Sequence, residues 1–226
     1  SRVMKRPISV LMPAMMVLLI AGSPFLQVEW GLTSWRALSP DDEARNGLEL
    51  TDEKWPGDVS NTAMLVFEVD TTSDIFSEEN LRSLHLLSKE ILEIENTMYV
   101  YSYAHFDVNM SADDVVNFWD ESGDENLTQQ EQAILQLQRE YHIDATVGND
   151  VILMVVGITG EQSSEESREV VLNIRSIESR NNQFGGGAIV NVAGFAAYNQ
   201  DVLEELIDGL PIALAIILTA RNVLII

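Results

Sequence analysis

The sequence predicts an α+β domain flanked by two membrane helices, and three features support this prediction. Residues 7–28, PISVLMPAMMVLLIAGSPFLQV, form 22 consecutive positions without a charge. Four apolar runs of strand length alternate with helical patterns between residues 62 and 194, and a second long apolar stretch, LPIALAIILTA, begins at Leu210. A bilayer core is about 30 Å thick and a helix rises about 1.5 Å per residue, so about 20 apolar residues span it.

The first apolar run predicts a transmembrane helix in residues 1–28. Three basic side chains, Arg2, Lys5 and Arg6, precede the run, and acidic residues predominate after it. The positive-inside rule therefore places the N-terminus in the cytoplasm and residues 29–208 outside it. The expected location is the cell membrane, with several spans.

A secretory signal peptide is the alternative interpretation of the same run. The basic start, the apolar core and the small residues at 21–23 resemble its three parts. Cleavage after Ser23 would, however, place Pro24 in the peptidase groove, where its fixed φ and missing N–H fit poorly. The chain also begins with Ser1 rather than Met, so we expect it to be part of a longer protein.

The charge of the segment between Glu29 and Asp208 limits its partners. This segment holds nine basic and 36 acidic side chains, a formal charge of −27. Such a surface repels nucleic acid and anionic lipid headgroups, so we expect no nucleic-acid partner. We interpret the acidic excess as a solvated surface in preference to an acidic docking site. The chain has no cysteine, which excludes disulfides and any cysteine-based metal or redox site.

A connecting segment, residues 29–61, leads into the first half of the predicted domain. The run TAMLVFEVD, residues 62–70, is typical of a strand buried on both faces or nearly so. A helix over 77–95 follows, with glutamates in its first turn, where the helix dipole favours negative charge. Its apolar side chains recur at helical spacing and form one buried stripe: Leu84, Leu87, Ile91 and Ile94. The run starting at Met98, MYVYSYA, predicts the second strand.

Residues 106–149 are predicted to be a polar insertion containing two helices, over 112–119 and 129–141. Thr128 and Glu131 have the spacing of a capping box at the start of the second helix. The run DVILMVVGIT, residues 150–159, predicts the third strand. These patterns place the insertion between two strands of the domain.

The remaining elements complete the predicted domain, which covers residues 62–208. Ser163 and Glu166 are interpreted as a capping box that opens a helix over 164–180, and AIVNVAG, residues 188–194, predicts the fourth strand. A last helix begins at Phe195 and continues through Pro211 into residues 209–226, the expected start of the next membrane helix. The order strand, helix, strand, insertion, strand, helix, strand is typical of the ferredoxin-like, split βαβ fold.

Several segments together carry a resemblance to a known family. They are VMKRPISVLMP and GSPFLQV in the first apolar run, ALSPDDEARNGLEL after it, and SREVVLNIRSI followed by VNVAGFAAYNQDVLEELIDGLP near the end. In this order and spacing, the chain resembles the MMPL (mycobacterial membrane protein large) branch of the resistance-nodulation-division (RND) transporters. The resemblance covers nearly the whole chain and corresponds to the seventh transmembrane helix, the second porter domain and the start of the eighth helix.

The resemblance implies membership of a proton-driven membrane exporter of lipids or other hydrophobic molecules. It implies that the porter domain shapes the extracytoplasmic substrate path together with the other half of the same transporter. The proton relay would lie on other helices, because residues 7–28 contain no ionisable side chain. The alternative function is a membrane-anchored extracytoplasmic domain that binds or senses a ligand without transporting it. Neither function is enzymatic.

The insertion contains a candidate calcium site. The segment DESGDENLTQQE, residues 120–131, places oxygen-bearing residues at the ligand positions of an EF-hand loop: Asp120, Ser122, Asp124, Asn126, Thr128 and Glu131. Glu125 occupies the position where the loop normally needs glycine for a sharp turn. An acidic helix-turn-helix, in which Thr128 and Glu131 only cap a helix, is therefore the alternative.

No other cofactor or catalytic motif is apparent. The three histidines, His85, His105 and His142, lack the spacing of metal ligands and are interpreted as structural. The three consecutive glycines at 185–187 are not followed by Lys-Ser or Lys-Thr, so they do not form a phosphate-binding loop. The sequence also contains no GxSxG nucleophile motif.

Overall fold

The structure is a computed structural model that describes residues 12, 15–17, 20, 38–54, 61–69, 74–181 and 188–224. It divides into two units, residues 1–31 and 32–226, and the second contains every element named below. In chain order these elements are α3 (Glu43–Lys54), β1 (Thr62–Glu68), α4 (Glu78–Leu92), β2 (Thr97–Tyr101), α5 (Ala112–Trp119), the 3-10 helix η3 (Glu121–Asn126), α6 (Gln129–Thr146), β3 (Val151–Ile158), α7 (Glu165–Asn181), β4 (Ile189–Ala193) and α8 (Phe195–Leu224).

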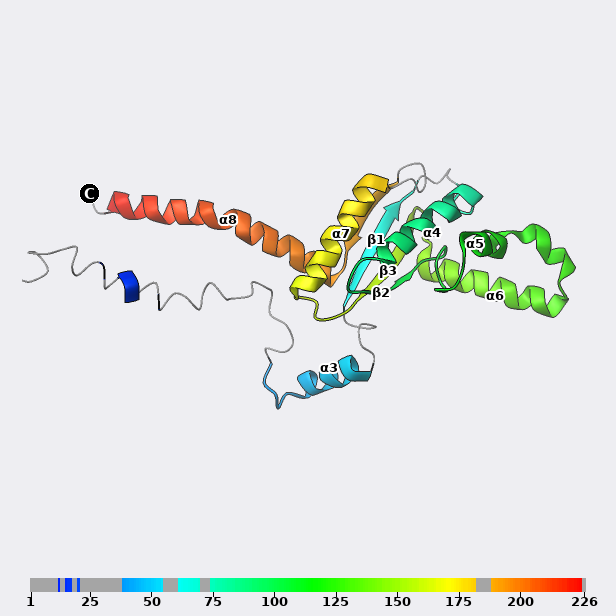
Figure 1. The fold of residues 1–226 in the computed structure, drawn as a ribbon, viewed down its shortest axis with the longest axis horizontal. Coiled ribbons are helices and arrows are strands. Elements are labelled where there is room, and N and C mark those ends of the chain that lie inside the picture. Colours follow the sequence, from blue (N-terminus) through cyan, green and yellow to red (C-terminus); the bar gives the residue numbers. More distant parts are fainter. Residues whose placement is uncertain are drawn as a thin grey trace, which may run out of the picture. The chain divides into compact units, whose positions relative to one another are not determined.

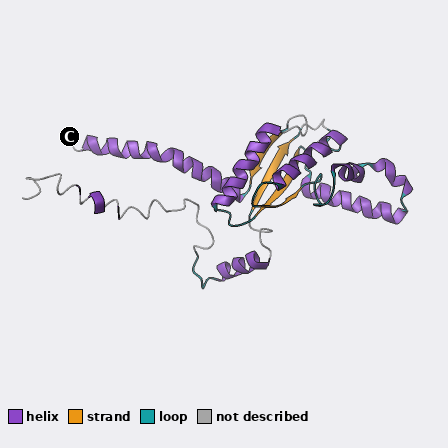
Figure 2. Ribbon diagram, viewed as in Figure 1, coloured by secondary structure: helices purple, strands orange, loops and turns teal. Residues whose placement is uncertain are grey.

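The four strands form one antiparallel sheet in the order β2-β3-β1-β4 (Figure 2). This sheet and its helices confirm the predicted α+β class, and all four predicted strands are present. Both β1 and β2 pair antiparallel with β3, so they run parallel to each other with β3 between them. By the same logic β3 and β4 are parallel, with β1 between them.

Helices α4 and α7 pack on the same face of the sheet and contact each other (Figure 1). Alternate residues of β1 point into this layer, and Ala63, Leu65 and Phe67 have no exposed surface. From the helices, Leu84 and Ile174 are also fully buried. Because every second strand residue faces the helices, one layer of apolar side chains closes the core.

A buried polar contact joins the start of β1 to the start of α7. The Asn61 amide donates to Ser167 Oγ at 2.7 Å and to the Gly160 carbonyl at 3.1 Å. Asn61 and Ser167 have no exposed surface, so these bonds satisfy donors that water cannot reach. This contact places the N-terminal turn of α7 beside β1.

A glycine permits the close approach between β4 and β1. Gly194 has φ +102°, and a Cβ built on it would lie 2.5 Å from the Thr62 carbonyl oxygen. Only glycine adopts this conformation without steric strain at such a distance. The chain therefore passes from β4 directly into α8 through a single residue.

Helix α8 is continuous over 30 residues and includes Pro211. Its first turns pack through small side chains, since Ala196 and Ala197 are buried. Its larger apolar side chains are exposed, with Phe195 64% and Tyr198 59% accessible. The predicted helix is confirmed, but these large side chains do not face the core.

The predicted transmembrane segment at 1–28 lies largely outside the described residues. Within this segment the structure describes Met12, residues 15–17 and Ile20, and these are helical. Among the described residues, no helix has both the length and the apolar character that a membrane crossing requires. The start of the second predicted span falls within α8, and the side chains of residues 217–226 also lie outside the description.

Candidate functional site

The insertion between β2 and β3 contains the predicted site and consists of α5, η3 and α6. A cluster of aromatic rings attaches it to the sheet domain. The Phe76 and Trp119 ring centroids are 4.8 Å apart, and Trp119 Nε1 donates to the Tyr103 carbonyl at 3.0 Å. The hydroxyl of Tyr103 in turn donates to the Ile75 carbonyl at 2.8 Å, and burial raises the pKa of Tyr103.

A second group of rings joins α6 to β2 and α5. His142 stacks on Phe106 with centroids 4.0 Å apart, and its Nδ1 lies 2.9 Å from the Tyr101 hydroxyl, within hydrogen-bond distance. Phe118 lies against both Phe106 and His142. Burial lowers the pKa of His142, which favours the neutral ring in this apolar setting.

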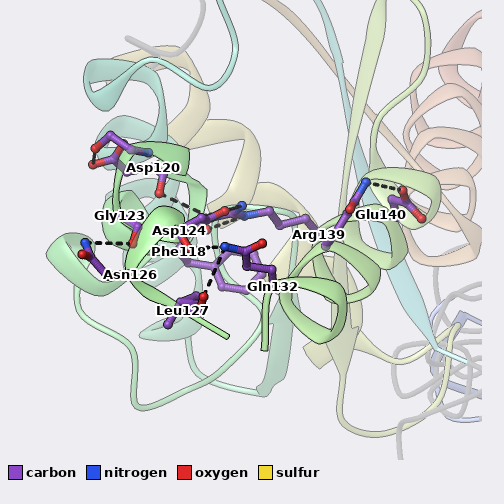
Figure 3. A network of polar contacts seen from close by, with 11 residues as sticks. Phe118, Asp120, Gly123, Asp124, Asn126, Leu127, Gln132, Arg139 and Glu140 are labelled. Atoms are coloured by element: carbon purple, nitrogen blue, oxygen red, sulfur yellow. Dashed lines mark hydrogen bonds and ion pairs between the residues drawn. The ribbon is translucent and has the colours of Figure 1, made fainter. Parts of the chain in front are cut away.

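Arg139 on α6 is the centre of a polar network inside the insertion (Figure 3). Only 8% of it is exposed, and its guanidinium forms a two-bond contact with Asp124, at 2.5 and 3.3 Å. Nε donates to the Phe118 carbonyl at 2.7 Å and Nη2 to the Asp120 carbonyl at 3.4 Å. A buried cation is stable only when a carboxylate and hydrogen-bond acceptors replace its water, as they do here. Through these bonds, the Arg139 side chain joins the end of α5 and η3 to α6.

The first half of the predicted calcium loop forms η3. Asp120 caps this helix, with its two carboxylate oxygens accepting from the backbone N–H and the hydroxyl of Ser122, both at 2.9 Å. These bonds hold the pKa of Asp120 below its usual range. The Asn126 amide donates to the Gly123 carbonyl at 3.4 Å, and Asp124 is engaged by Arg139.

The second half of the loop forms the predicted capping box of α6. The Glu131 carboxylate accepts from the Thr128 backbone N–H at 2.9 Å and from its hydroxyl at 2.7 Å. The Glu131 N–H donates back to Thr128 Oγ1 at 3.3 Å. Hydrogen bonds from the Thr128 hydroxyl and backbone lower the pKa of Glu131. The capping prediction is confirmed.

The six proposed calcium ligands are thus engaged in four separate local contacts. Asp120 and Ser122 form the cap of η3, Asp124 pairs with Arg139, Asn126 donates to the Gly123 carbonyl, and Thr128 pairs with Glu131. Within the described part of the chain, no group of three or more acidic or histidine side chains is placed to hold a metal ion. Calcium binding would require these contacts to rearrange, and it stays a prediction.

A groove of about 800 Å³ lies between α6 and the α5–η3 segment. Phe76, Trp119 and Ile143 provide its apolar part, and Arg139 and Asp124 lie in its wall. The acidic residues that line it include Glu121, Glu125 and Glu140. Its volume is within the usual range for small-molecule pockets.

Sequence reasoning did not identify Arg139 or the groove. One signal was present, because Arg139 is the only basic residue between Lys89 and Arg168. Many carboxylates lie in the sequence between Lys89 and Arg168, so Arg139 has many possible partners. The pairing with Asp124 depends on how η3 packs on α6, which the spacing alone does not specify.

Two of the three histidines form a buried pair next to the insertion. His85 Nδ1 donates to the Ala104 carbonyl at 2.9 Å, and the ring centroids of His85 and His105 are 5.2 Å apart. His105 is 1% exposed, and neither of its ring nitrogens has a hydrogen-bond partner among the described residues. Burial, with smaller effects from His85 and Lys89, lowers the pKa of His105 to about 4.

No protein-family model and no curated protein matches this sequence.

Proposed function

We propose that this chain is part of a proton-driven exporter of the RND/MMPL type. In this proposal residues 62–208 are a porter domain that shapes the extracytoplasmic path of lipids or other hydrophobic molecules. The chain would lie in a multi-pass protein of the cell membrane, next to the other half of the same transporter. The domain would transmit motion and line the substrate path, without catalysis or a cofactor.

The strand order is the observation that carries this proposal. The two βαβ units are β1-α4-β2 and β3-α7-β4. In the order β2-β3-β1-β4, the two strands of each unit are parallel and are separated by one strand of the other unit. The helices of both units, α4 and α7, lie on one face (Figure 1). This arrangement is what a ferredoxin-like, split βαβ porter domain requires, and it supports that finer assignment.

The connection between the sheet and α8 supports a mechanical role. Helix α8 begins one residue after β4 and packs on α7, where Arg175 and Asp201 form an ion pair at 2.6 Å. The helix then continues through Pro211. Proline lacks the N–H that would bond the Ile207 carbonyl, which makes this turn a natural hinge. Motion of a membrane bundle would reach the sheet through this helix.

A flexible insertion in α8 tests the mechanical role in the full-length protein. Cells lacking the gene are complemented with the wild type or with a variant carrying Gly-Ser after Asp208, and surface-extractable lipids are compared by mass spectrometry. We expect the insertion to abolish the rescue, because it interrupts the rigid connection. The melting temperature of the 226-residue chain should change little.

The same Gly-Ser pair inserted after Asn109, in an exposed turn, is the matched control and should preserve the rescue. If export survives the insertion after Asp208, the domain is a passive vestibule or a binding module. If the deletion changes no exported lipid or other hydrophobic molecule, the exporter proposal itself is wrong.

A membrane-anchored ligand-binding or sensing domain is the second candidate, and the groove in the insertion favours it. The full reading frame distinguishes the two functions. An exporter should have about eleven or twelve spans and a second copy of the helix-domain-helix unit, following the internal-repeat logic of transporters. A protein with two spans in total would be a sensor.

A further inference from the structure

The groove in the insertion combines aromatic surface with carboxylates that form no ion pair among the described residues, one of which, Glu140, accepts a hydrogen bond from the Gln136 amide at 3.3 Å. Its apolar side is formed by Phe76, from the turn before α4, and Trp119, from the end of α5. The two rings are inclined at 45° with centroids 4.8 Å apart, so they form a corner. Both side chains are half-buried, which leaves part of each ring at the groove.

The polar edge of the indole is already occupied. Trp119 lines the groove, and its Nε1 donates to the Tyr103 carbonyl, so the indole N–H is not available to a ligand. Aromatic faces carry partial negative charge and attract cations within about 6 Å of the ring centroid. Tryptophan is the strongest of the side chains in this respect.

The net charge of the residues that line the groove is negative even though Arg139 is one of them. Arg139 is neutralised by Asp124 and bound by two carbonyls, so it offers no free positive charge to a ligand. Glu121, Glu125 and Glu140 are exposed along the same groove. None of the three forms an ion pair within the described residues. Three carboxylates therefore face a pocket with an aromatic corner.

We propose that this groove binds a small organic cation, either a protonated amine or a quaternary ammonium that carries an apolar group. The cationic centre would lie near the carboxylates and the Trp119 face, and the apolar group would fill the space lined by Phe76 and Ile143. An anion would be repelled by the three glutamates. The proposal does not depend on export.

Benzyltrimethylammonium is a suitable probe because it has a fixed charge and one aromatic ring. The full chain is labelled with 5-fluorotryptophan and studied by ¹⁹F NMR in a non-ionic maltoside detergent at constant ionic strength. Its four tryptophans give separate signals, and Trp119→Phe assigns the relevant one. We expect a saturable shift of the Trp119 signal with Kd of about 1 mM or lower, and no saturable shift with neutral benzyl alcohol.

Paired substitutions separate a site from general attraction to an acidic protein. Glu121→Gln with Glu125→Gln should weaken binding about fivefold or more, as expected for two partly exposed charges. The control, Glu165→Gln with Glu169→Gln, removes the same charge from exposed positions on α7 and should leave Kd unchanged. Phe76→Leu should weaken binding while preserving both charges.

Three results would overturn the proposal. The first is no saturable shift of the Trp119 signal below about 10 mM probe, which is too weak for a specific site. The second is an equal effect of benzyl alcohol, which would mean that charge is not recognised. The third is an equal loss of affinity in the two glutamate pairs, which would mean diffuse attraction to the whole acidic surface.

Discussion

Arg139 shows how one residue stabilises a whole segment. It is 8% exposed, and its bonds reach Asp124 and the carbonyls of Phe118 and Asp120, so it joins three elements of the insertion. No other residue described in the insertion brings a positive charge to this acidic loop. Its removal should affect packing as well as charge.

The substitution Arg139→Met should destabilise the insertion. It leaves Asp124 without its partner and the two carbonyls without a donor, so we expect a loss of about 2 kcal/mol. Thermal unfolding of the full chain in maltoside measures this loss. Arg82→Met is the matched control, since Arg82 pairs with Glu78 and Asp113 on the surface and should have a much smaller effect. Equal effects would mean that the Arg139 network is not structural.

His105 should make the fold sensitive to acid. Burial lowers its pKa to about 4 in the folded chain, against about 6.5 when unfolded. Between these values the unfolded state binds more protons, so stability rises with pH in this window and is lost as pH falls from about 6.5 to 4. The full shift corresponds to an upper limit of about 3.4 kcal/mol.

The variant His105→Phe keeps an apolar ring of similar size and removes the titration. Urea unfolding at several pH values should show that the variant loses less stability than the wild type between pH 6.5 and 4. His142→Phe is the comparison, because His142 is only half-buried and should contribute less. Parallel pH profiles for His105→Phe and the wild type would contradict the assignment.

Helix caps show how much a short sequence pattern can predict. The Thr128–Glu131 box was predicted and is present, because both of its partners lie within one turn. The predicted Ser163–Glu166 box is wrong: Ser164 Oγ accepts from the Ser167 N–H at 3.2 Å. Ser163 and Ser164 are adjacent, so the sequence does not determine which of them caps the helix. The buried hydrogen bond between Ser167 and Asn61, from a distant part of the chain, then selects Ser164.

At the scale of elements, periodicity predicted the strands and the two central helices. The strand runs were identifiable because few polar residues interrupt them, and the stripe of α4 because Leu84, Leu87 and Ile91 are all buried. Helix α8 differs: its large apolar residues are exposed while Ala196 and Ala197 are buried. The small buried side chains follow directly after the close approach of Gly194 to β1, which hydrophobicity alone does not reveal.

Two substitutions on α7 test which face of this helix packs against the sheet. Ile174 has no exposed surface, so Ile174→Asp would bury an unpaired charge and should unfold the domain, at a cost of about 4 kcal/mol or more. Leu172→Asp makes the same chemical change on the same helix, but Leu172 is 47% exposed. Circular dichroism should show unfolding only for Ile174→Asp. An unchanged melting temperature for that variant would mean that the helix face is misassigned.

At the scale of the molecule, the order of elements was predictable and the site was not. The alternation of strand and helix patterns indicated an α+β domain with an insertion, and the antiparallel sheet agrees with it. The groove is formed by Phe76, before α4, together with residues of the distant α5 and α6, and the Phe76 and Trp119 rings are in contact. Such long-range contacts have no signature in local spacing, so the acidic loop suggested calcium where the structure shows an arginine network.

The proposed function depends first on the side of the membrane that the domain occupies. The acidic domain follows a basic N-terminal segment, so residues 29–208 should lie outside the cytoplasm. The chain has no native cysteine, which makes single-cysteine labelling with a membrane-impermeant maleimide possible without further substitutions. Glu169→Cys places a thiol at an exposed position on α7, and Ser1→Cys places one at the N-terminus.

Labelling of these two variants in intact spheroplasts is the most direct measurement. We expect Glu169→Cys to react in intact spheroplasts and Ser1→Cys to react only after detergent is added. Labelling of Glu169→Cys only after permeabilisation would place the domain in the cytoplasm and contradict the proposed extracytoplasmic role.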